Sequence, residues 1–309
     1  MQKNIELIKY NLYKIERGRN SIMDIKQYKR AFTHAGYFHA DDVFSAAFIK
    51  MLNPDLKINR VLSLPNDANE ETDLIFDIGA YDGFTKFDHH QKNKEYRPDT
   101  DIPYAAFGLL WKEFGKDLGI SDNVFTKIEQ KLVIPIDLAD NGITTNALSS
   151  VISTYNPFWD EEVNPDDQFN VAVALAYNIL KRTIDRAISS ENAQNAILEA
   201  YKHIDNHVLV LDTYLPISLD LFKSMPDVLF YVYPSNRGGF NISAVPEPTV
   251  YDEFAKRAYF PYEWLGNPDK SLGMTFCHPN NFLASADTKE HAINIANIAI
   301  DRHYSLHSA

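Results

Sequence analysis

The sequence contains almost no cysteine and no long apolar run, and both absences narrow the class of protein. Cys277 is the only cysteine in 309 residues, which excludes an internal disulfide framework and a zinc cage built from thiolates. No segment reaches the roughly eighteen consecutive apolar residues that a membrane helix needs, and residues 1–22 lack the apolar core of a secretory signal. We therefore expect a soluble, cytoplasmic protein with no membrane partner. Residues 1–22 are open to two interpretations, an appended helix or a segment before a functional start at Met23.

The chain also lacks an excess of positive charge. It has 30 Lys and Arg against 42 Asp and Glu, which gives a net charge of −12. Because this charge repels a polyanion at long range, nucleic acid would need a local basic groove or metal cations to receive it. The composition argues against a general nucleic-acid binder, but not against an enzyme that meets phosphate groups at a metal site.

Short apolar stretches alternate with helical patterns from about residue 31, which is typical of β-α-β units and a parallel sheet. We expect strands at 31–33, 59–64 and 73–78, and helices at 42–52, 104–114 and 123–138. Pro135 either kinks the last of these helices or opens a new turn. The order predicts an α/β fold, with a doubly wound parallel sheet in a first domain of residues 1–206.

A second, smaller α/β domain is predicted for residues 207–309. Before it, residues 166–206 show helical periodicity without a strand pattern, which suits a spacer between two lobes. The strand pattern then returns at 208–211, 228–233, 240–245 and 273–276, and a closing helix is expected at about 289–303. The length of the chain fits two domains better than one core.

Carboxylates and imidazoles gather in three blocks of the first domain. The blocks contribute His34, His39 and Asp41, then Asp77 with Asp88, His89 and His90, and finally Asp137 and Asp140. In open parallel sheets, reactive groups collect where strands end and helices begin. Because the blocks follow predicted strands or lie on a predicted helix, we expect them to form one metal centre.

The types of ligand in these blocks favour particular ions and a particular reaction. Asp77 closes a strand and could bridge two ions, while one of Asp137 and Asp140 would complete the second ion; the sequence leaves open which. Imidazoles and carboxylates without a thiolate favour Mn²⁺ or Mg²⁺, with Co²⁺ or Zn²⁺ as substitutes. Two ions about 3.5–4 Å apart would generate hydroxide near neutral pH and neutralise phosphoryl charge. Hydrolysis of a phosphate bond is therefore the expected reaction class.

Each block also has an explanation that needs no metal. Asp41 or Asp42 could cap the N-terminus of a helix, and Asp88 could open a turn that exposes the two histidines after it. The sequence Asp-Asn-Gly at 140–142 is an ordinary signal for the end of a helix. The joint occurrence of the blocks favours the metal centre.

These blocks form longer motifs. Residues 33–42 read Thr-His-Ala-Gly-Tyr-Phe-His-Ala-Asp-Asp, residues 87–91 read Phe-Asp-His-His-Gln, and residues 136–142 contain Asp-x-x-Asp-Asn-Gly. They resemble the motifs of the DHH phosphoesterase superfamily and, within it, the melanocyte-proliferating-gene (Myg-type) exonuclease family. Further similarity extends over nearly the whole chain after Met23, at residues 76–82, 148–150, 156–159, 244–246 and 260–264.

The resemblance implies a role for each of these side chains. The implied metal ligands are His34, His39, Asp41, Asp77, His89 and Asp140, with Asp77 bridging two ions. His90 would touch phosphate, and we predict His90, Asp88 and Asp42 as catalytic residues. In the second domain, the residues predicted to hold substrate across a cleft between the lobes are Arg237, Arg257 and His278.

The chain departs from the family pattern mainly in its second half. Asp42 replaces the usual Glu, and Leu265 stands where Arg is common. Residues 277–285 (Cys-His-Pro-Asn-Asn-Phe-Leu-Ala-Ser) replace the stretch His-Ala-Ser-Gly-Phe-Ile-Gly-Gly. The metal blocks are intact and the substrate-facing part is altered, so the resemblance constrains the metal chemistry more tightly than the substrate.

The activity that the resemblance implies is 3′→5′ removal of nucleotides from single-stranded RNA or DNA. One alternative is a phosphohydrolase of small molecules such as pyrophosphate, short oligonucleotides or cyclic dinucleotides, which the acidic net charge favours. Another is a catalytically inactive, metal-binding interaction protein. The expected partners are single-stranded nucleic acid or a small phosphate compound, and a homo-oligomer is left open.

Overall fold

The structure, a computed structural model, describes residues 24–69, 71–83 and 85–307. Both interpretations of residues 1–22 therefore lie outside the described residues. The chain divides into two compact units, Met1–Ile188 and Ser189–Ala309. The division falls nearer the N-terminus than the boundary expected after residue 206, and the assignment of two functional domains stays a prediction.

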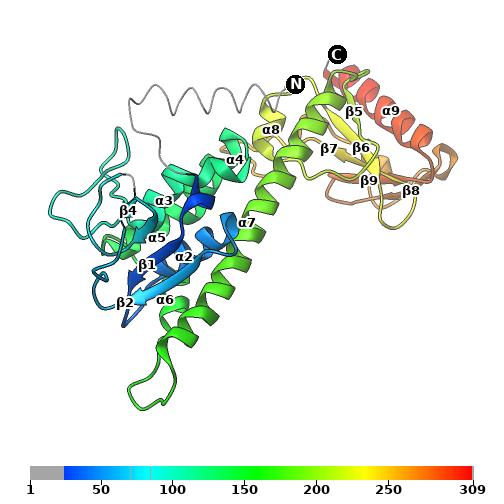
Figure 1. Ribbon diagram of the computed structural model, residues 1–309. Helices are drawn as coiled ribbons and strands as arrows, with labels where there is room; N and C mark the ends of the chain where they lie inside the picture. Colours follow the sequence, from blue (N-terminus) through cyan, green and yellow to red (C-terminus); the bar gives the residue numbers. More distant parts are fainter. Residues whose placement is uncertain (1–23, 70, 84, 308–309) are drawn as a thin grey trace. The chain divides into compact units, whose positions relative to one another are not determined.

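The first unit contains a parallel sheet of four strands in the order β2-β1-β3-β4 (Figure 1). The strands are β1 Arg30–His34, β2 Lys57–Val61, β3 Asp73–Phe76 and β4 Lys86–Phe87. β1 is central and pairs Ala31 with Ile58 on one side and with Leu74 on the other. Every residue of β3 is buried, as expected for an apolar strand that is covered on both faces. The predicted α/β class with a parallel sheet is confirmed.

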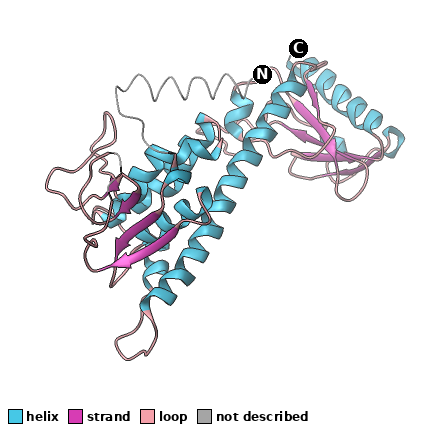
Figure 2. Ribbon diagram, in the orientation of Figure 1, coloured by secondary structure: helices cyan, strands magenta, loops and turns pink. Residues whose placement is uncertain are grey.

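Helices that pack on one another lie beside this sheet (Figure 2). They are α2 Ala40–Leu52, α3 Ala106–Phe114, α4 Asp122–Ile128, α5 Ile134–Asp140 and α6 Ala147–Ser153. Two aromatic contacts join α2 to α3: the ring centroids of Phe44 and Phe107 are 5.7 Å apart, and those of Phe48 and Trp111 are 5.4 Å apart. This packing fixes the start of α2 beside the start of α3, where the candidate ligands lie.

The helix predicted at 123–138 is present in the structure and contains a π-helical segment. This segment, Glu129–Val133, lies between α4 and α5, and Pro135 stands in the first turn of α5. Proline has no N–H to donate to the preceding turn and its ring crowds that turn, so the backbone widens before it. Glu129, Val133 and Ile134 all have right-handed helical φ and ψ, so the helix continues through this segment and does not begin anew at Pro135. The expected kink at Pro135 stays a prediction.

A single long helix, α7 Pro165–Tyr201, occupies the region predicted as a helical spacer. The division between the two compact units falls within it. Within the described part of the chain, neither α7 nor any other helix combines the length and apolarity that a membrane span requires.

The second unit contains a mixed sheet of five strands in the order β5-β6-β7-β9-β8. The strands are β5 Val208–Val210, β6 Phe230–Pro234, β7 Phe240–Ala244, β8 Met274–Cys277 and β9 Leu283–Ala286. β5 and β6 are parallel, and the other pairs are antiparallel. The short helix α8 Leu219–Lys223 follows β5, and α9 Lys289–His307 packs on the sheet. The expected second α/β region is thus confirmed, although β9 and α8 were not predicted.

Candidate metal centre

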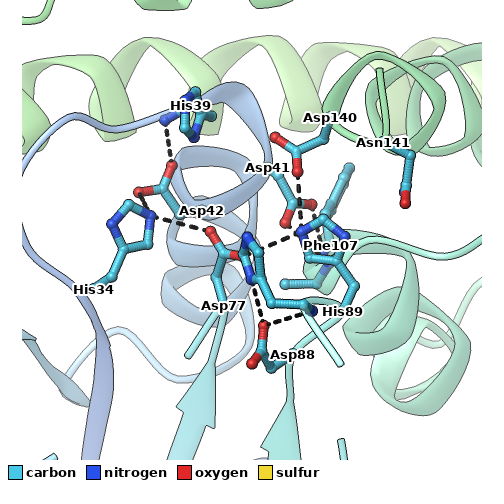
Figure 3. A network of polar contacts seen from close by, with 12 residues as sticks. His34, His39, Asp41, Asp42, Asp77, Asp88, His89, Phe107, Asp140 and Asn141 are labelled. Carbon is cyan, nitrogen blue, oxygen red and sulfur yellow. Dashed lines mark hydrogen bonds and ion pairs between the residues drawn. The ribbon is translucent and has the colours of Figure 1, made fainter. Parts of the chain in front are cut away.

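The strands and helices of the first unit bring the ligand blocks to one edge of the sheet. β1 ends at His34, β3 ends one residue before Asp77, and β4 ends one residue before Asp88. Because these strands are parallel, their carboxyl ends meet at the same edge. α2 begins directly after His39 and α5 ends at Asp140, so their side chains reach the same region (Figure 3).

Asp77 lies in the middle of this centre. Its Oδ2 is 3.1 Å from Nε2 of His34, and its Oδ1 is 3.4 Å from Nε2 of His89. Its backbone φ is +55°, in the left-handed region that Asp tolerates better than most residues and that often marks functional sites. The two oxygens of one buried carboxylate therefore face two different imidazoles, and the bridging role of Asp77 stays a prediction.

His89 joins Asp77 to a group of carboxylates on the helical side. Its Nε2 lies 3.0 Å from Oδ2 of Asp140. Asp41, His89 and Asp140 each offer a ligand atom, and these atoms all lie within 4.8 Å of one another. The three residues come from α2, the end of β4 and α5, so the group depends on the tertiary fold.

The N-terminus of α3 holds Asp41 in this group. The N–H of Ala106 donates to Oδ2 of Asp41 at 2.9 Å, and the N–H of Phe107 donates to Oδ1 at 2.8 Å. Helix N-termini leave their first N–H groups without intrahelical partners and attract negative charge. Asp41 is fully buried, and its orientation is fixed by these two bonds.

A second group lies on the other side of Asp77. It consists of His34, Asp42 and Asp77, again with ligand atoms within 4.8 Å of one another. Oδ2 of Asp42 is 3.3 Å from Nε2 of His34, while Oδ1 of Asp42 accepts the backbone N–H of His39 at 2.9 Å. Asp42 was predicted as a catalytic residue; the structure places it among the atoms that can bind a cation.

Among the metal ligands that the resemblance implies, His39 alone lies outside the groups found in the described part of the chain. Its ring centroid is 6.3 Å from that of His34, and His39 is the N-cap residue of α2. The ring therefore lies beside the centre, and its role as a ligand stays a prediction.

His90 and Asp88 form a pair at the exposed side of the centre. Nδ1 of His90 and Oδ1 of Asp88 are 2.7 Å apart, and Oδ2 of Asp88 accepts the N–H of Ala80 at 2.7 Å. The side chain of His90 is 61% exposed, whereas Asp88 is buried. A third possible ligand group combines His90 with Asp77 and His89. Asp88 thus fixes the orientation of the exposed imidazole of His90.

Asp137 and Asp140 contact different residues. Its Oδ2 accepts a bond from Nη2 of Arg97 at 2.6 Å, and its Oδ1 accepts the N–H of Gly108 at 3.1 Å. A Cβ atom at Gly108 would lie 1.8 Å from Oδ2 of Asp137, so only glycine fits there. Between the two carboxylates that the sequence left open, the geometry therefore groups Asp140 with the other ligands and gives Asp137 a structural partner.

Burial and mutual contact shift the pKa values of the central residues. Hydrogen bonding to Asp77 raises the pKa of His34 to about 9, and burial raises the pKa of Asp42 to about 8. Burial would raise the pKa of Asp77, but its contacts with the imidazoles of His34 and His89 lower it. Burial would lower the pKa of His89, but its contacts with Asp140 and Asp77 raise it to about 11. The centre thus retains protons that a bound cation would displace.

Several buried atoms of the centre make no well-aligned hydrogen bond within the described residues, although three of them lie in the imidazole–carboxylate contacts described above. These buried atoms are Oδ2 of Asp42, Oδ1 of Asp77 and both ring nitrogens of His89. An unsatisfied buried polar atom costs about 1–3 kcal/mol, so a concentration of such atoms calls for a partner. Carboxylate oxygens and imidazole nitrogens are common ligands of divalent cations. The residues present therefore fit a divalent metal centre.

The three residues predicted to hold substrate lie in the second unit. Arg257 donates from Nη1 to the carbonyls of Met225 at 2.6 Å and Val228 at 3.0 Å, and from Nη2 to that of Phe222 at 2.8 Å. These bonds already use Nη1 and Nη2 within the protein, and the side chain is only 9% exposed.

The other two residues are more accessible than Arg257. Arg237 is exposed in the turn between β6 and β7. The ring of His278 is half-buried, lies 4.3 Å from that of Phe282, and accepts the N–H of Asn280 at Nδ1. The substrate-binding role of all three residues stays a prediction.

Sequence reasoning missed the residues that hold the ligands in place. Arg97, Gly108 and Asn156 are buried or closely packed neighbours of the blocks, yet each comes from a distant segment. Arg97 stands in a loop and has no periodic pattern around it. Asn156 belongs to the segment 156–159, which resembles the family, and this resemblance was the one feature of the sequence that could have marked it.

The parallel sheet and the buried carboxylate and imidazole groups at its carboxyl edge define an α/β protein with a centre for divalent metal ions. The chain belongs to the MYG1 exonuclease-type family: the family model MYG1_exonuc, described as Uncharacterised protein family (UPF0160), matches residues 30–300. The resemblance to the Myg-type family is therefore confirmed.

Relatives match over most of their length at low identity. The chain is 26% identical to the MYG1 protein C694.04c of Schizosaccharomyces pombe, over 87% of this chain and 96% of that protein. It is 23% identical to the MYG1 exonuclease of Mus musculus, over 91% of this chain and 86% of that protein. A crystal structure of RecJ in complex with Mn²⁺ from Thermus thermophilus matches with a TM-score of 0.30 and 12% identity, over 91% of this chain and 53% of that chain.

Proposed function

We propose that this protein is a metal-dependent phosphodiester hydrolase of the DHH type that removes nucleotides in the 3′→5′ direction from single-stranded RNA or DNA. The name of the mouse relative, MYG1 exonuclease, supports this activity class. The observation that carries the proposal is the position of Asp77, whose oxygens face His34 at 3.1 Å and His89 at 3.4 Å. A carboxylate shared by two imidazole groups suits a pair of ions.

The proposed ligands follow from the groups around Asp77. His34, Asp42 and Asp77 would hold one ion, with His39 as a further candidate, and Asp41, His89, Asp140 and Asp77 would hold the other. When bound, Mn²⁺ or Mg²⁺ would neutralise charge on phosphoryl oxygens and lower the pKa of water. The protein contributes the fixed orientation of these ligands, because buried carboxylates such as Asp41 are held by backbone N–H groups.

His90 is the proposed contact to the phosphate. Its Nδ1 is engaged by Asp88 at 2.7 Å, which leaves Nε2 directed away from that carboxylate. Because the side chain is 61% exposed, Nε2 can donate to a phosphate oxygen without leaving the site. Asp88 would thus position His90 and would not itself bind the ion.

A second candidate is a phosphohydrolase of small molecules. The net charge of −12 favours it, because a short substrate experiences less long-range repulsion than a polymer does. The cytoplasmic location stays a prediction, as does the assembly state.

A single set of assays with the full chain and Mn²⁺ separates these candidates. Single-stranded RNA or DNA labelled at the 5′ end should give a ladder of progressively shorter products, whereas a 3′ label should appear at once as mononucleotide. Orthophosphate released from pyrophosphate without a ladder would support the small-molecule enzyme. Bound Mn²⁺ with no product from any substrate would support an inactive metal-binding protein and contradict the proposal.

A further inference from the structure

The loop between β1 and α2 determines where several candidate ligands lie. It consists of residues 35–38, with His34 before it and His39, Asp41 and Asp42 after it. Gly36 in this loop has a φ of +93°, so the backbone makes a turn that other residues rarely adopt. A short loop of this kind needs outside contacts to keep its two ends in a fixed relation.

Asn156 supplies two such contacts from a distant part of the chain. Its Oδ1 accepts the N–H of Phe38 at 2.9 Å, and its Nδ2 donates to the carbonyl of the same residue at 2.8 Å. The two residues are 118 positions apart, and Asn156 is only 5% exposed. The side-chain amide therefore pairs with both backbone groups of the residue directly before His39.

Arg60 holds the same loop from β2. Its Nη2 donates to the carbonyl of Gly36 at 2.6 Å, and its Nη1 pairs with Asp166 at 2.8 Å. The guanidinium carbon lies 4.6 Å from the ring of Phe169 and 5.5 Å from that of Phe38, and the side chain is 3% exposed. Arg60 and Asn156 thus fix two points of a four-residue loop.

The two proposed ion sites depend on this loop to different degrees. Asp41 is held by the N–H groups of Ala106 and Phe107 in α3, independently of the loop. The other site touches the loop directly, although His34 itself closes β1 opposite Val61. Nδ1 of His34 lies 3.1 Å from the carbonyl of Ala35 in the loop, and Oδ1 of Asp42 accepts the N–H of His39, the residue directly after the loop. Loss of the loop contacts should therefore displace His34 and Asp42 before it displaces Asp41.

We propose that Asn156 is a positioning residue that fixes the loop 35–38 and thereby determines the affinity of the ion site formed by His34, Asp42 and Asp77. This inference rests on the proposed metal-dependent function. Groups that orient metal ligands typically change affinity by about 10–100-fold when they are mutated. The second ion site, which contains Asp41, His89 and Asp140, should keep its affinity.

The test is a calorimetric titration of the full chain with Mn²⁺. The Asn156→Asp variant keeps the acceptor for the N–H of Phe38 but loses the donor to its carbonyl, and Arg60→Lys keeps the charge but loses the forked contact. We expect wild type to bind two ions, and both variants to bind one of them about 10–100-fold more weakly while the other is unchanged. Excess Mn²⁺ should restore the hydrolysis rate of both variants, because the chemistry of the ligands is intact.

The matched control is Asn146→Ala. Asn146 accepts the N–H groups of Leu148 and Ser149 as the N-cap of α6, so its loss also removes two side-chain bonds of an asparagine in the first unit. This variant should have a lower Tm but wild-type affinity for both ions. If Asn156→Asp and Arg60→Lys lose Tm in the same way with unchanged Mn²⁺ affinities, the positioning role is wrong. A wild-type chain that binds no Mn²⁺ would instead overturn the proposed function itself.

Discussion

The two units of this chain hold their buried charged side chains in different ways. In the first unit, carboxylates face imidazoles, and buried atoms of Asp42, Asp77 and His89 make no well-aligned hydrogen bond within the described residues. In the second unit, Nη1 and Nη2 of Arg257 donate to three backbone carbonyls, and only its Nε lacks a hydrogen bond to a described residue. The contrast teaches that charge and burial alone do not identify a binding site. A site is indicated where folding brings polar atoms together and leaves them unsatisfied.

The largest effect is expected from Asp77→Asn. The substitution removes the charge and one of two anionic oxygens shared by the imidazole groups, so the loss of metal affinity should exceed the roughly 10–100-fold typical of outer residues. Hydrolysis should fall with it. The fold should persist, because Asn tolerates the positive φ at this position. Elemental analysis after dialysis measures the metal, and circular dichroism checks the fold.

The control for Asp77→Asn is Asp122→Asn. Asp122 is 99% exposed at the start of α4, so the same chemical change there should leave metal content and activity at wild-type levels. Full metal content and activity in Asp77→Asn would contradict the bridging role and remove the main difference between the two units.

An intermediate effect is expected when the metal is removed, and it should depend on pH. With Mg²⁺ at about 100 times its Kd, the metal-bound protein is about 2.7 kcal/mol more stable than the metal-free protein. In the metal-free protein, hydrogen bonding to Asp77 raises the pKa of His34 to about 9. The stability from its proton is therefore fully present below about pH 6.5 and is lost as pH rises through 9.

Thermal unfolding at about pH 6 and about pH 9, with Mg²⁺ and with chelator, measures this effect. The difference in Tm between the protein with Mg²⁺ and the protein with chelator should be larger at the higher pH. At that pH the carboxylates of the metal-free protein lose the protonated imidazole beside them, and protons no longer compete with the cation. Equal differences at both pH values would show that His34 is not linked to the metal centre.

The smallest effect on activity is expected from Arg257→Met. Because this arginine stabilises carbonyls of Phe222, Met225 and Val228, its loss should lower the free energy of unfolding by about 2–3 kcal/mol. The KM of the remaining folded protein should stay within about twofold of wild type. Arg237→Ala is the comparison: an exposed arginine should leave stability within about 0.5 kcal/mol. A raised KM in Arg257→Met with unchanged stability would instead support the substrate role expected from the sequence.

In the first sheet, β3 could be predicted because its apolar run Leu74-Ile75-Phe76 is continuous, and the strand is buried throughout. The predicted spacer corresponds to α7 because its helical periodicity is long. β4 escaped prediction since it has two residues, Lys86–Phe87, and no pattern can show in so short a strand. α8, with five residues, was missed for the same reason.

The sequence predicted which types of residue form the candidate site, but not which of two nearby residues of the same type belongs to it. Asp137 and Asp140 lie on one helix, and the difference between them comes from Arg97, 40 residues upstream, which pairs with Asp137. The contact of Asn156 with Phe38 spans 118 residues. Such choices depend on tertiary contacts that local patterns do not contain.

The first turn of α3 has a consequence for how an anionic ligand can approach. Helix N-termini commonly receive phosphate groups through their free N–H groups. Here the amides of Ala106 and Phe107 are occupied by Asp41, and that of Gly108 by Asp137. The first turn of α3 therefore offers none of these three N–H groups to an anionic ligand. Under the proposed function, the bound cations and His90 would contact the phosphate in place of this helix.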